Sequence, residues 1–331
     1  MKAIVINGPG GDFAYSADRG CPECPEGWAV VKVAYCGICG SDLPRFGCST
    51  YRYPSIAGHE FSGEVVKTAA GGRAKPGDKV AILPLMPCMK CGACRERRFF
   101  HCEAYQFIGS RNDGGFAEYC AVKEDNIFIL PGGMDMKEAA LIEPALVGLH
   151  AARRSGFKAG DRAIVFGAGP IGLMTASWLR FLGAGAVCIA DIREYSLGIA
   201  RKMGFSDAVD PSSAQGKFDV AYEASGAGEA LHNGIRLVKE GGTVTVVGRD
   251  ANDTLIPRAL FETLMRKELS VLGCWGYEAE GEEALLYAAL QSGALRLGEL
   301  ITHVIPCEAA VETIKKMLNR EMDYCKILVE F

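Results

Sequence analysis

Two patterns of apolar and polar positions divide the sequence. Over about the first 130 residues, short apolar runs alternate with segments that contain Gly or Pro, as in antiparallel β-structure. From Met136 onward, helical runs alternate with short apolar runs, which predicts a parallel sheet covered by helices on both faces. The strands expected in the first part are 28–34, 63–68, 79–83 and 117–122.

The second pattern extends as far as Trp275. It predicts helices over 141–154 and from Ile171, and strands over 163–166, 187–190, 219–222 and 243–247. Beyond Trp275 we expect helices over 282–291 and 309–319 and a closing strand over 327–331. The predicted fold class is α/β, with a partly open β-barrel and a doubly wound parallel sheet.

Composition indicates two domains and a small-molecule partner. A chain of 331 residues, 49% of them hydrophobic, exceeds the usual size of one domain. The net charge of -4 is spread without long runs of one sign, so no nucleic-acid surface is expected. No apolar run is long enough to cross a bilayer, and residues 1–6 resemble a strand rather than a signal segment. We therefore expect a cytoplasmic protein without a membrane partner.

The chain has 14 cysteines, too many for ordinary core packing alone. In a long chain of a reducing compartment, metal ligation is a more plausible use for them than a disulfide framework. Four of them lie inside apolar or strand-like runs and are expected to be small buried residues. These are Cys120, Cys188, Cys307 and Cys325.

A glycine-rich turn follows the strand expected over 163–166. Gly167 permits a tight turn, Gly169 lets the backbone approach a pyrophosphate, and Gly172 lets the following helix pack on the strand. Asp191 ends the next strand, nineteen residues after Gly172, where a carboxylate would bind the adenosine ribose. The alternative is a purely structural turn. The candidate cofactor residues are Gly167, Gly169, Pro170, Ile171, Gly172, Asp191, Arg193, Val247 and Gly248.

The carboxylate of Asp191 also bears on the choice of cofactor. It would repel the 2′-phosphate of NADP, so the sequence favours NAD. Arg193, two residues later, would soften that preference.

Four cysteines fall within one short loop. Cys88, Cys91, Cys94 and Cys102 have the spacing C-x2-C-x2-C-x7-C, and four thiolates can close a tetrahedral shell around a structural zinc ion. An iron–sulfur cluster or chance clustering of free thiols are the alternatives. Zinc is favoured because a redox cluster has no evident role beside a hydride cofactor.

A second metal site is suggested by residues far apart in the sequence. Cys39, His59, Glu60 and Glu143 offer one thiolate, one imidazole and one or two carboxylates, a set that leaves a zinc position open for substrate. Their spacing alone does not bring them together. Taken singly, each has an ordinary interpretation as a core, surface or helix-start residue.

Taken together, these motifs resemble the zinc-containing medium-chain dehydrogenases, which include alcohol, sorbitol and threonine dehydrogenases. The resemblance rests on segments 39–42 and 58–60, the four-cysteine loop and the Rossmann turn, in that order along nearly the whole chain. It implies a GroES-like catalytic domain over 1–148 with a structural zinc lobe at about 86–104, an NAD-binding domain over 149–274, and a return to the catalytic domain over 275–331.

The resemblance also implies roles for individual residues. Cys39, His59 and Glu143 would bind catalytic zinc, with Glu60 coordinating it or exchanging with water. Asp42 would orient the zinc-bound histidine. Cys36 would not be a ligand. Two zinc ions and one NAD per chain are expected, in a homodimer or homotetramer that uses the edge strand near 269–273.

A branch of the family that oxidises polyol phosphates is the most similar, through segments 39–45, 59–63 and 108–119. This implies NAD-linked oxidation of galactitol 1-phosphate to tagatose 6-phosphate. The family's histidine beyond the Ser-Asp pair is replaced here by Leu43-Pro44-Arg45, so a proton relay would use Ser41 and water. Arg45 and Arg111, and more weakly Arg52, are candidates to bind the substrate phosphate, although a solvated arginine is the simpler interpretation of each.

Three other functions remain open at this stage. Another polyol, polyol-phosphate or threonine dehydrogenase would share every motif above. A zinc-loaded, NAD-binding redox sensor would share them without catalysing hydride transfer. A zinc-free reductase on the same scaffold would lack the metal.

Overall fold

The computed structural model describes residues 1–69, 72–249, 253–278 and 281–331. The chain forms two compact units. The first comprises residues 1–143 and 301–331, and the second comprises residues 144–300.

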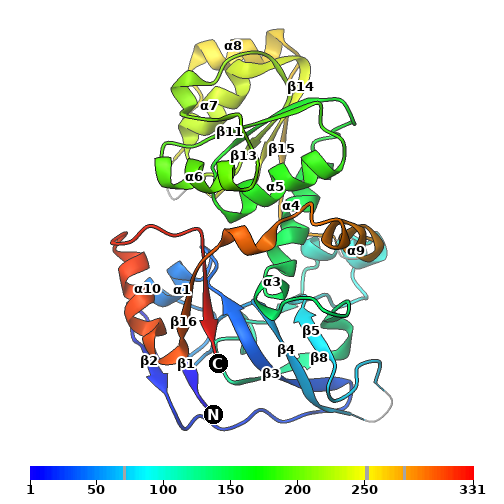
Figure 1. Ribbon diagram of the computed structural model, residues 1–331, viewed down its shortest axis with the longest axis vertical. Coiled ribbons are helices and arrows are strands. Elements are labelled where there is room, and N and C mark those ends of the chain that lie inside the picture. Colours follow the sequence, from blue (N-terminus) through cyan, green and yellow to red (C-terminus); the bar gives the residue numbers. More distant parts are fainter. Residues whose placement is uncertain (70–71, 250–252, 279–280) are drawn as a thin grey trace. The chain divides into compact units, whose positions relative to one another are not determined.

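A seven-stranded sheet organises the first unit, in the order β16-β17-β3-β4-β5-β9, with β8 also paired to β3. All pairs are antiparallel except β16 with β17. The long strand β3 therefore contacts three neighbours and is the centre of this unit (Figure 1). The strands are β3 (Trp28–Gly37), β4 (Glu60–Thr68), β5 (Lys79–Ile82), β8 (Tyr119–Lys123), β9 (Ile127–Ile129), β16 (Ile301–Pro306) and β17 (Lys326–Glu330).

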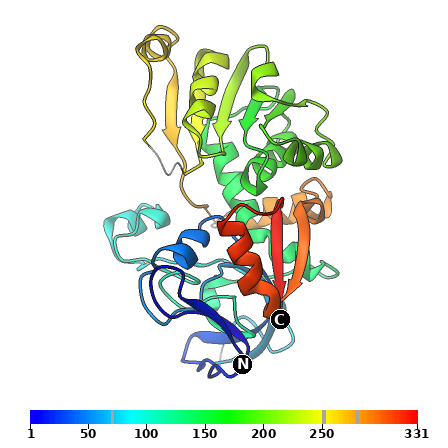
Figure 2. The ribbon, with the colours of Figure 1, turned by 90° about the vertical axis from the view of Figure 1, so that its left-hand side faces the viewer.

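Smaller elements complete the first unit. The strands β1 (Ala3–Ile6) and β2 (Phe13–Ser16) form a hairpin, and β6 (Leu85–Met86) pairs with β7 (Gln106–Phe107). Helix α10 (Ala310–Leu318) contacts both β2 and helix α1 (Leu43–Gly47), so segments from the two ends of the sequence lie side by side (Figure 2). The apolar sides of these elements, with Phe46, Phe61 and Phe116 fully buried, form one continuous core.

A six-stranded parallel sheet organises the second unit, in the order β12-β11-β10-β13-β14-β15. The chain starts in the middle, moves outward through β11 and β12, and returns to β13 on the other side of β10. With right-handed crossovers, this reversal places helices on both faces. The strands are β10 (Arg162–Phe166), β11 (Ala186–Ala190), β12 (Ala208–Val209), β13 (Phe218–Glu223), β14 (Val238–Val246) and β15 (Ser270–Gly273).

The helices of the second unit connect these strands. Helices α5 and α6 contact β11, whereas α7 contacts β13 and β14. Helix α5 is buried along most of its length, because its apolar residues are not confined to one stripe. The helices are α4 (Ile142–Arg154), α5 (Pro170–Phe181), α6 (Glu194–Lys202), α7 (Gly228–Leu237), α8 (Arg258–Arg266) and α9 (Glu283–Gln291).

The predicted fold class, a GroES-like domain with a Rossmann-type parallel sheet, is confirmed. The unit boundaries differ from those expected at 148/149 and 274/275, and lie at 143/144 and 300/301. Residues beyond Trp275 stay with the second unit because Glu282 binds Arg153 and the carbonyl of Ala294 accepts a hydrogen bond from Arg180. No helix of the described residues is long and apolar enough to span a membrane.

Candidate functional site

The turn after β3 presents a cysteine and a serine side by side. Cys39 N–H donates to Asp42 Oδ2 at 3.1 Å, which closes the turn at the start of α1. The hydroxyl of Ser41 donates to Cys39 Sγ at 3.3 Å. The sulfur is therefore held in place by its own loop.

Strand pairing brings His59 and Glu60 to this turn. The last residue of β3, Gly37, is the pairing partner of Glu60 at the start of β4. As a result, ligand atoms of Cys39, His59 and Glu60 all lie within 4.8 Å of one another. Three predicted site residues that are separated in sequence thus converge within one unit.

The imidazole of His59 is backed by a buried carboxylate. Its Nδ1 lies 3.3 Å from Oδ1 of the fully buried Asp42, but this atom makes no hydrogen bond. Burial lowers the pKa of His59, yet the negative charges of Asp42 and Cys39 outweigh it, so the pKa is raised well above its usual value. Arg45 Nη1 donates to the same oxygen, Asp42 Oδ1, at 3.0 Å. The Asp42 carboxylate therefore lies next to both Arg45 and His59.

This donor set fits a zinc ion. The cluster offers one thiol, one imidazole and one carboxylate, whose ligand atoms lie within 4.8 Å of one another. These are the ligand types that zinc prefers in catalytic sites. The carboxylates of Asp42 and Glu60, both buried, lie beside these donors, and a bound cation would interact favourably with them.

Glu143 lies outside the group of three ligand atoms that the described residues form. It is the second residue of α4 and is buried. Burial is the main cause that raises its pKa to about 7, and His59, Glu60, Lys326 and Asp42 are close enough to act on its charge. Glu143 therefore lies near Cys39, His59 and Glu60, but its carboxylate is not among the ligand atoms that lie within 4.8 Å of one another.

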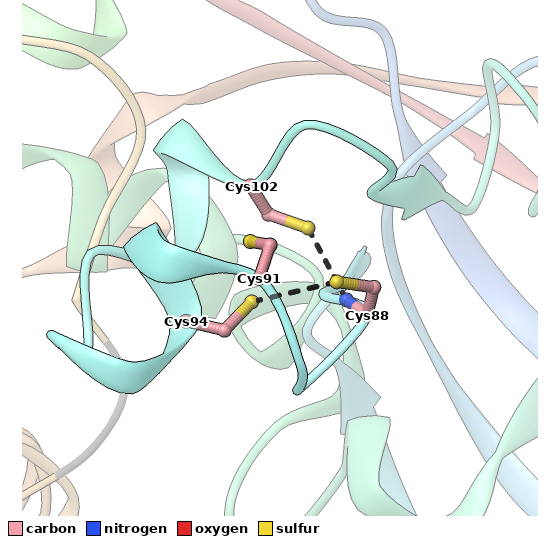
Figure 3. Close-up of side chains that lie close together, drawn as sticks. All are labelled: Cys88, Cys91, Cys94 and Cys102. Atoms are coloured by element: carbon pink, nitrogen blue, oxygen red, sulfur yellow. Dashed lines mark hydrogen bonds between the residues drawn. The ribbon is translucent and has the colours of Figure 1, made fainter.

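The four-cysteine loop forms a second cluster. Ligand atoms of Cys88, Cys91, Cys94 and Cys102 lie within 4.8 Å of one another, and the four sulfurs point toward a common centre (Figure 3). Cys88 Sγ is 3.9 Å from Cys94 Sγ, too far for a disulfide. A tetrahedral ion with zinc–sulfur bonds of about 2.3 Å would separate its sulfurs by roughly 3.8 Å. The spacing therefore fits zinc.

Local structure explains why this loop gathers its sulfurs. The short helix α2 (Gly92–Arg95) starts at Cys91, and the 3-10 turn Phe99–His101 leads to Cys102. Backbone N–H groups of Cys94 and Glu103 are the main cause that lowers the pKa of Cys91 to about 6. At Cys91 the backbone thus favours the thiolate, the form that binds metal, whereas burial raises the pKa of Cys94 to about 12.

The glycine turn of the second unit leads from β10 into α5. Gly167 has φ +103°, and a Cβ on Gly172 would lie 1.9 Å from the carbonyl oxygen of Gly167. A Cβ on Gly169 would meet nothing within 4 Å, so this position faces open space at the start of α5. Pro170 and Ile171 are the first two residues of that helix, which has no side-chain cap. Its N-terminal N–H groups are available to an anion.

Asp191 lies next to this turn. Its Oδ2 accepts a hydrogen bond from Ala168 N–H at 2.7 Å, and its Oδ1 accepts one from Arg193 N–H at 2.8 Å. The guanidinium of Arg193 is 3.9 Å away from Oδ1 and half-exposed. Val247 and Gly248 follow β14 at the same carboxyl edge of the sheet, where ligands bind in doubly wound folds.

The candidate phosphate-binding arginines already have protein partners. Arg45 donates to Ser41 O and to Asp42, and Arg52 forms an ion pair with Asp113. Arg111 stacks on Tyr105, with its Cζ 4.0 Å from the ring centroid, and donates to the carbonyl oxygen of the same residue. A guanidinium group has five N–H donors, so these contacts leave some N–H groups of each arginine able to bind another acceptor.

Comparison with known proteins assigns the family. Residues 25–132 match the alcohol dehydrogenase GroES-like domain, and residues 170–291 match the zinc-binding dehydrogenase family. Galactitol 1-phosphate 5-dehydrogenase of Escherichia coli (strain K12) is 34% identical, with 97% of this chain and 98% of that protein covered. The chain belongs to the zinc-dependent medium-chain alcohol dehydrogenase family. It is an oxidoreductase of this type.

Two further comparisons describe the range of this family. Sorbitol dehydrogenase of Bacillus subtilis (strain 168) is 30% identical, with 93% of this chain and 91% of that protein covered. The crystal structure of galactitol-1-phosphate dehydrogenase from Escherichia coli superposes with a TM-score of 0.92 at 32% identity, covering 100% of both chains. The crystal structure of a zinc-binding dehydrogenase from Sinorhizobium meliloti 1021, bound to NADP, superposes with a TM-score of 0.90 at 28% identity. The match covers 100% of this chain and 99% of that one.

Sequence reasoning on this medium-chain dehydrogenase missed two buried charged residues. Lys326, at the start of β17, donates from Nζ to Glu60 Oε2 at 2.6 Å and to Ile38 O at 3.3 Å. Glu223 ends β13 and accepts three hydrogen bonds from the next turn. The available signal was a charged residue at the start or the end of an apolar strand. Such a residue tends to be buried, and a buried charge requires a partner.

Proposed function

We propose that this protein oxidises a secondary alcohol of a polyol or polyol phosphate with NAD, and that galactitol 1-phosphate, converted to tagatose 6-phosphate, is its substrate. The observation that carries the proposal is the convergence of Cys39, His59 and Glu60 within 4.8 Å in a chain of this family. The similarity to galactitol 1-phosphate 5-dehydrogenase over 97% of the chain supports the choice of substrate.

Cys39, His59 and Glu143 would hold the catalytic zinc, with Glu60 as an additional or exchanging ligand. When bound, zinc supplies Lewis-acid polarisation of the substrate hydroxyl, and the nicotinamide accepts the hydride. Asp42 orients His59 from behind, and Lys326 compensates the charge of Glu60. The two functions of Glu60, pairing with Lys326 and binding metal, draw on the same carboxylate.

The alcohol proton leaves through this chain's own hydroxyl group. Ser41 Oγ lies next to Cys39 Sγ, is only partly buried, and passes the proton to water. No histidine follows the Ser-Asp pair, since Leu43, Pro44 and Arg45 occupy those positions. The overall reaction converts alcohol and NAD⁺ to ketone, NADH and one proton.

Cys88, Cys91, Cys94 and Cys102 would hold a second, structural zinc ion. Their sulfurs surround one point, and four protein ligands leave no place for substrate. Because thiolate clusters of this kind persist in reducing surroundings, we propose that the protein acts in the cytoplasm.

The cofactor would be NAD rather than NADP. Asp191 presents a carboxylate beside the glycine turn, where the ribose of an adenosine would bind. Arg193 keeps its guanidinium half-exposed and 3.9 Å from Asp191, so it is available to neutralise this carboxylate only in part.

Of the two candidate arginines, Arg111 is the better one for a substrate phosphate. Its backbone N–H donates to Phe107 O at 2.9 Å, and the centroid of the Phe107 ring lies 5.6 Å from that of the His59 ring, with the two planes tilted, so the Arg111 backbone is one residue contact away from His59. Stacking on Tyr105 fixes the plane of its guanidinium group. Arg45 is turned toward Asp42 and Ser41, which suits a structural role better.

The protein would act as a homodimer or homotetramer. Strand β15 is the last strand of its sheet and has one described partner, β14. Val271 on this strand and Phe261 and Met265 on α8 are exposed apolar side chains. An open edge beside apolar residues suits pairing with the same strand of a second copy.

A kinetic panel tests the proposal directly. Galactitol 1-phosphate, galactitol, sorbitol and threonine are each compared for kcat/KM with NAD and with NADP. We expect the highest value for galactitol 1-phosphate with NAD. A higher value for sorbitol would make this a sorbitol dehydrogenase, and no hydride transfer to any alcohol would favour a redox-sensing role. Metal analysis of the same preparation should find two zinc ions per chain, whereas none would indicate a zinc-free reductase.

A further inference from the structure

Glu223 carries a buried negative charge that the chemistry above does not use. It is the last residue of β13 and only 3% exposed. Its Oε1 accepts three hydrogen bonds of 2.7 Å, from the N–H groups of Ser225 and Gly226 and from the Ser225 hydroxyl. Several donors on one oxygen compensate for the burial of a carboxylate without a lysine or arginine. This side chain therefore fixes the turn that follows its own strand.

The backbone of the same residue fixes a second turn. The carbonyl oxygen of Glu223 accepts hydrogen bonds from Val247 N–H at 2.8 Å and from Gly248 N–H at 2.9 Å. These two residues follow β14, the neighbouring strand in the sheet. One residue thus connects the turns after two adjacent parallel strands.

The two turns are packed without free space between them. A Cβ on Gly248 would lie 2.2 Å from Gly226 N and 2.6 Å from Glu223 Oε2. Gly226 has φ +73°, and a Cβ there would lie 2.4 Å from Arg249 O. The Glu223 carboxylate is therefore in close contact with both turns.

The glycine turn of the cofactor site rests on the first of these turns. A Cβ on Gly167 would lie 2.9 Å from Ala224 C and from Ser225 N. The position of residues 224–226 consequently limits where the turn that leads into α5 can lie. This links Glu223 to the phosphate-binding end of α5 through direct packing.

We infer that Glu223 is a positioning residue of the dinucleotide site, which holds the turns after β13 and β14 against the glycine turn. This inference rests on the proposed function only in that the second unit binds a nicotinamide dinucleotide.

Glu223→Gln tests the inference by removing the charge while keeping the shape of the side chain. The dissociation constant for NAD, measured by calorimetry on the zinc-loaded protein, should rise by about tenfold, because a charge-assisted contact becomes a neutral one. The zinc content and the kcat at saturating NAD should stay unchanged. Glu223→Asp, whose shorter side chain cannot reach both N–H groups, should raise the constant in the same way.

Tyr222→Phe is the matched control. It changes the preceding residue of the same buried strand and removes the hydroxyl that contacts Ser155 Oγ at 2.7 Å and donates to Ala152 O at 3.1 Å. We expect a lower melting temperature with NAD affinity within about twofold of wild type, since this network lies away from the turns. All binding is measured at a temperature where each variant is fully folded.

The outcomes separate the two ideas. Unchanged NAD affinity in Glu223→Gln and Glu223→Asp would overturn the positioning role alone. Equal losses of affinity in Tyr222→Phe and Glu223→Gln would also overturn it, because general destabilisation would then explain both. If the wild-type protein binds no dinucleotide, the proposed function itself is wrong.

Discussion

Lys326 Nζ and Glu60 Oε2 form a 2.6 Å ion pair in which both side chains are almost completely buried. Burial alone would lower the pKa of Lys326, but the charge of Glu60 outweighs it and raises the pKa. A Cβ on Gly37 would lie 2.5 Å from Glu60 Oε2 and 3.4 Å from Lys326 Cδ, so a residue without a side chain is needed beside the pair. Residues of three neighbouring strands, β3, β4 and β17, thus meet beside Cys39 and His59.

Lys326→Met should destabilise the protein because it leaves the Glu60 carboxylate buried without a cation. Breaking a pair of this kind costs about 3–5 kcal/mol of the free energy of unfolding. We expect the loss to be larger in metal-stripped than in zinc-loaded protein, as followed by urea unfolding. The double variant Lys326→Met/Glu60→Gln should recover part of the stability. Equal urea midpoints for wild type and the single variant would contradict this account.

Cys39→Ser should abolish turnover while leaving NAD binding within about twofold, because the residues proposed to bind the cofactor and those proposed to bind the metal lie in different units. Zinc content should fall from two to one per chain. Cys48→Ser, at an exposed cysteine outside both clusters, is the control and should retain both metal and activity. Equal loss of NAD affinity and turnover in Cys39→Ser would disprove the separation of the two roles.

Cys91→Ser should remove the other zinc ion and lower the melting temperature. The loop has few buried apolar residues of its own, with Cys94 and Cys102 buried and its arginines exposed, so the metal supplies its stability. Cys21→Ser, at an exposed cysteine, provides the control for loss of a thiol. A variant that keeps two zinc ions would show that Cys91 is not a ligand.

Asp191→Ser should shift the cofactor preference toward NADP. Removing the carboxylate takes away a repulsive charge and leaves the Arg193 guanidinium unpaired. We expect the ratio of kcat/KM for NAD to that for NADP to fall by at least about tenfold, equivalent to roughly 1.4 kcal/mol. Asp210→Ser, which removes a carboxylate at the N-cap of an exposed turn, should leave the ratio unchanged.

Glu282→Gln should stabilise the protein at neutral pH. Burial is the main cause that raises the pKa of Glu282, against the opposing effect of Arg153, and its Oε2 has no hydrogen-bond partner. A raised carboxyl pKa means that the stabilising contribution is full below the unfolded-state pKa and is lost as pH rises through the folded-state value. Glutamine keeps an acceptor for Arg153 without the charge.

The measurement is the urea midpoint of the wild type and of Glu282→Gln at a series of pH values from acid pH to pH 7. Glu282→Gln should exceed wild type at pH 7, and the difference should shrink at acid pH. A lower midpoint for the variant at pH 7 would show that the ion pair with Arg153 outweighs burial.

Local patterns in the sequence identified most of the fold. Alternating apolar runs predicted β3, β5, β10 and β11 to within a few residues, because each strand buries a continuous apolar face. Cys120, Cys188, Cys307 and Cys325 are buried as expected. The glycine turn at 167–172 was recognisable because its strand, helix and acidic residue follow in sequence.

Long-range contacts were not readable in the same way. The pairing of Gly37 with Glu60 brings Cys39 close to His59. The spacing of these residues in the sequence does not reveal which residues of the two strands pair. The partner of Lys326 is likewise set by tertiary structure. The end of the second unit at residue 300 depends on the contacts of Arg153 and Arg180, which an amphipathic pattern does not reveal.

The position of β17 between β16 and β3 has a consequence for biosynthesis. A ribosome releases residues 144–300 before β16 and β17, so the parallel sheet can close while the antiparallel one still lacks two strands. Until Lys326 emerges, the Glu60 carboxylate has no cation beside it. Translation therefore completes the parallel sheet first, and the buried ion pair of Glu60 forms only after β17 has been made.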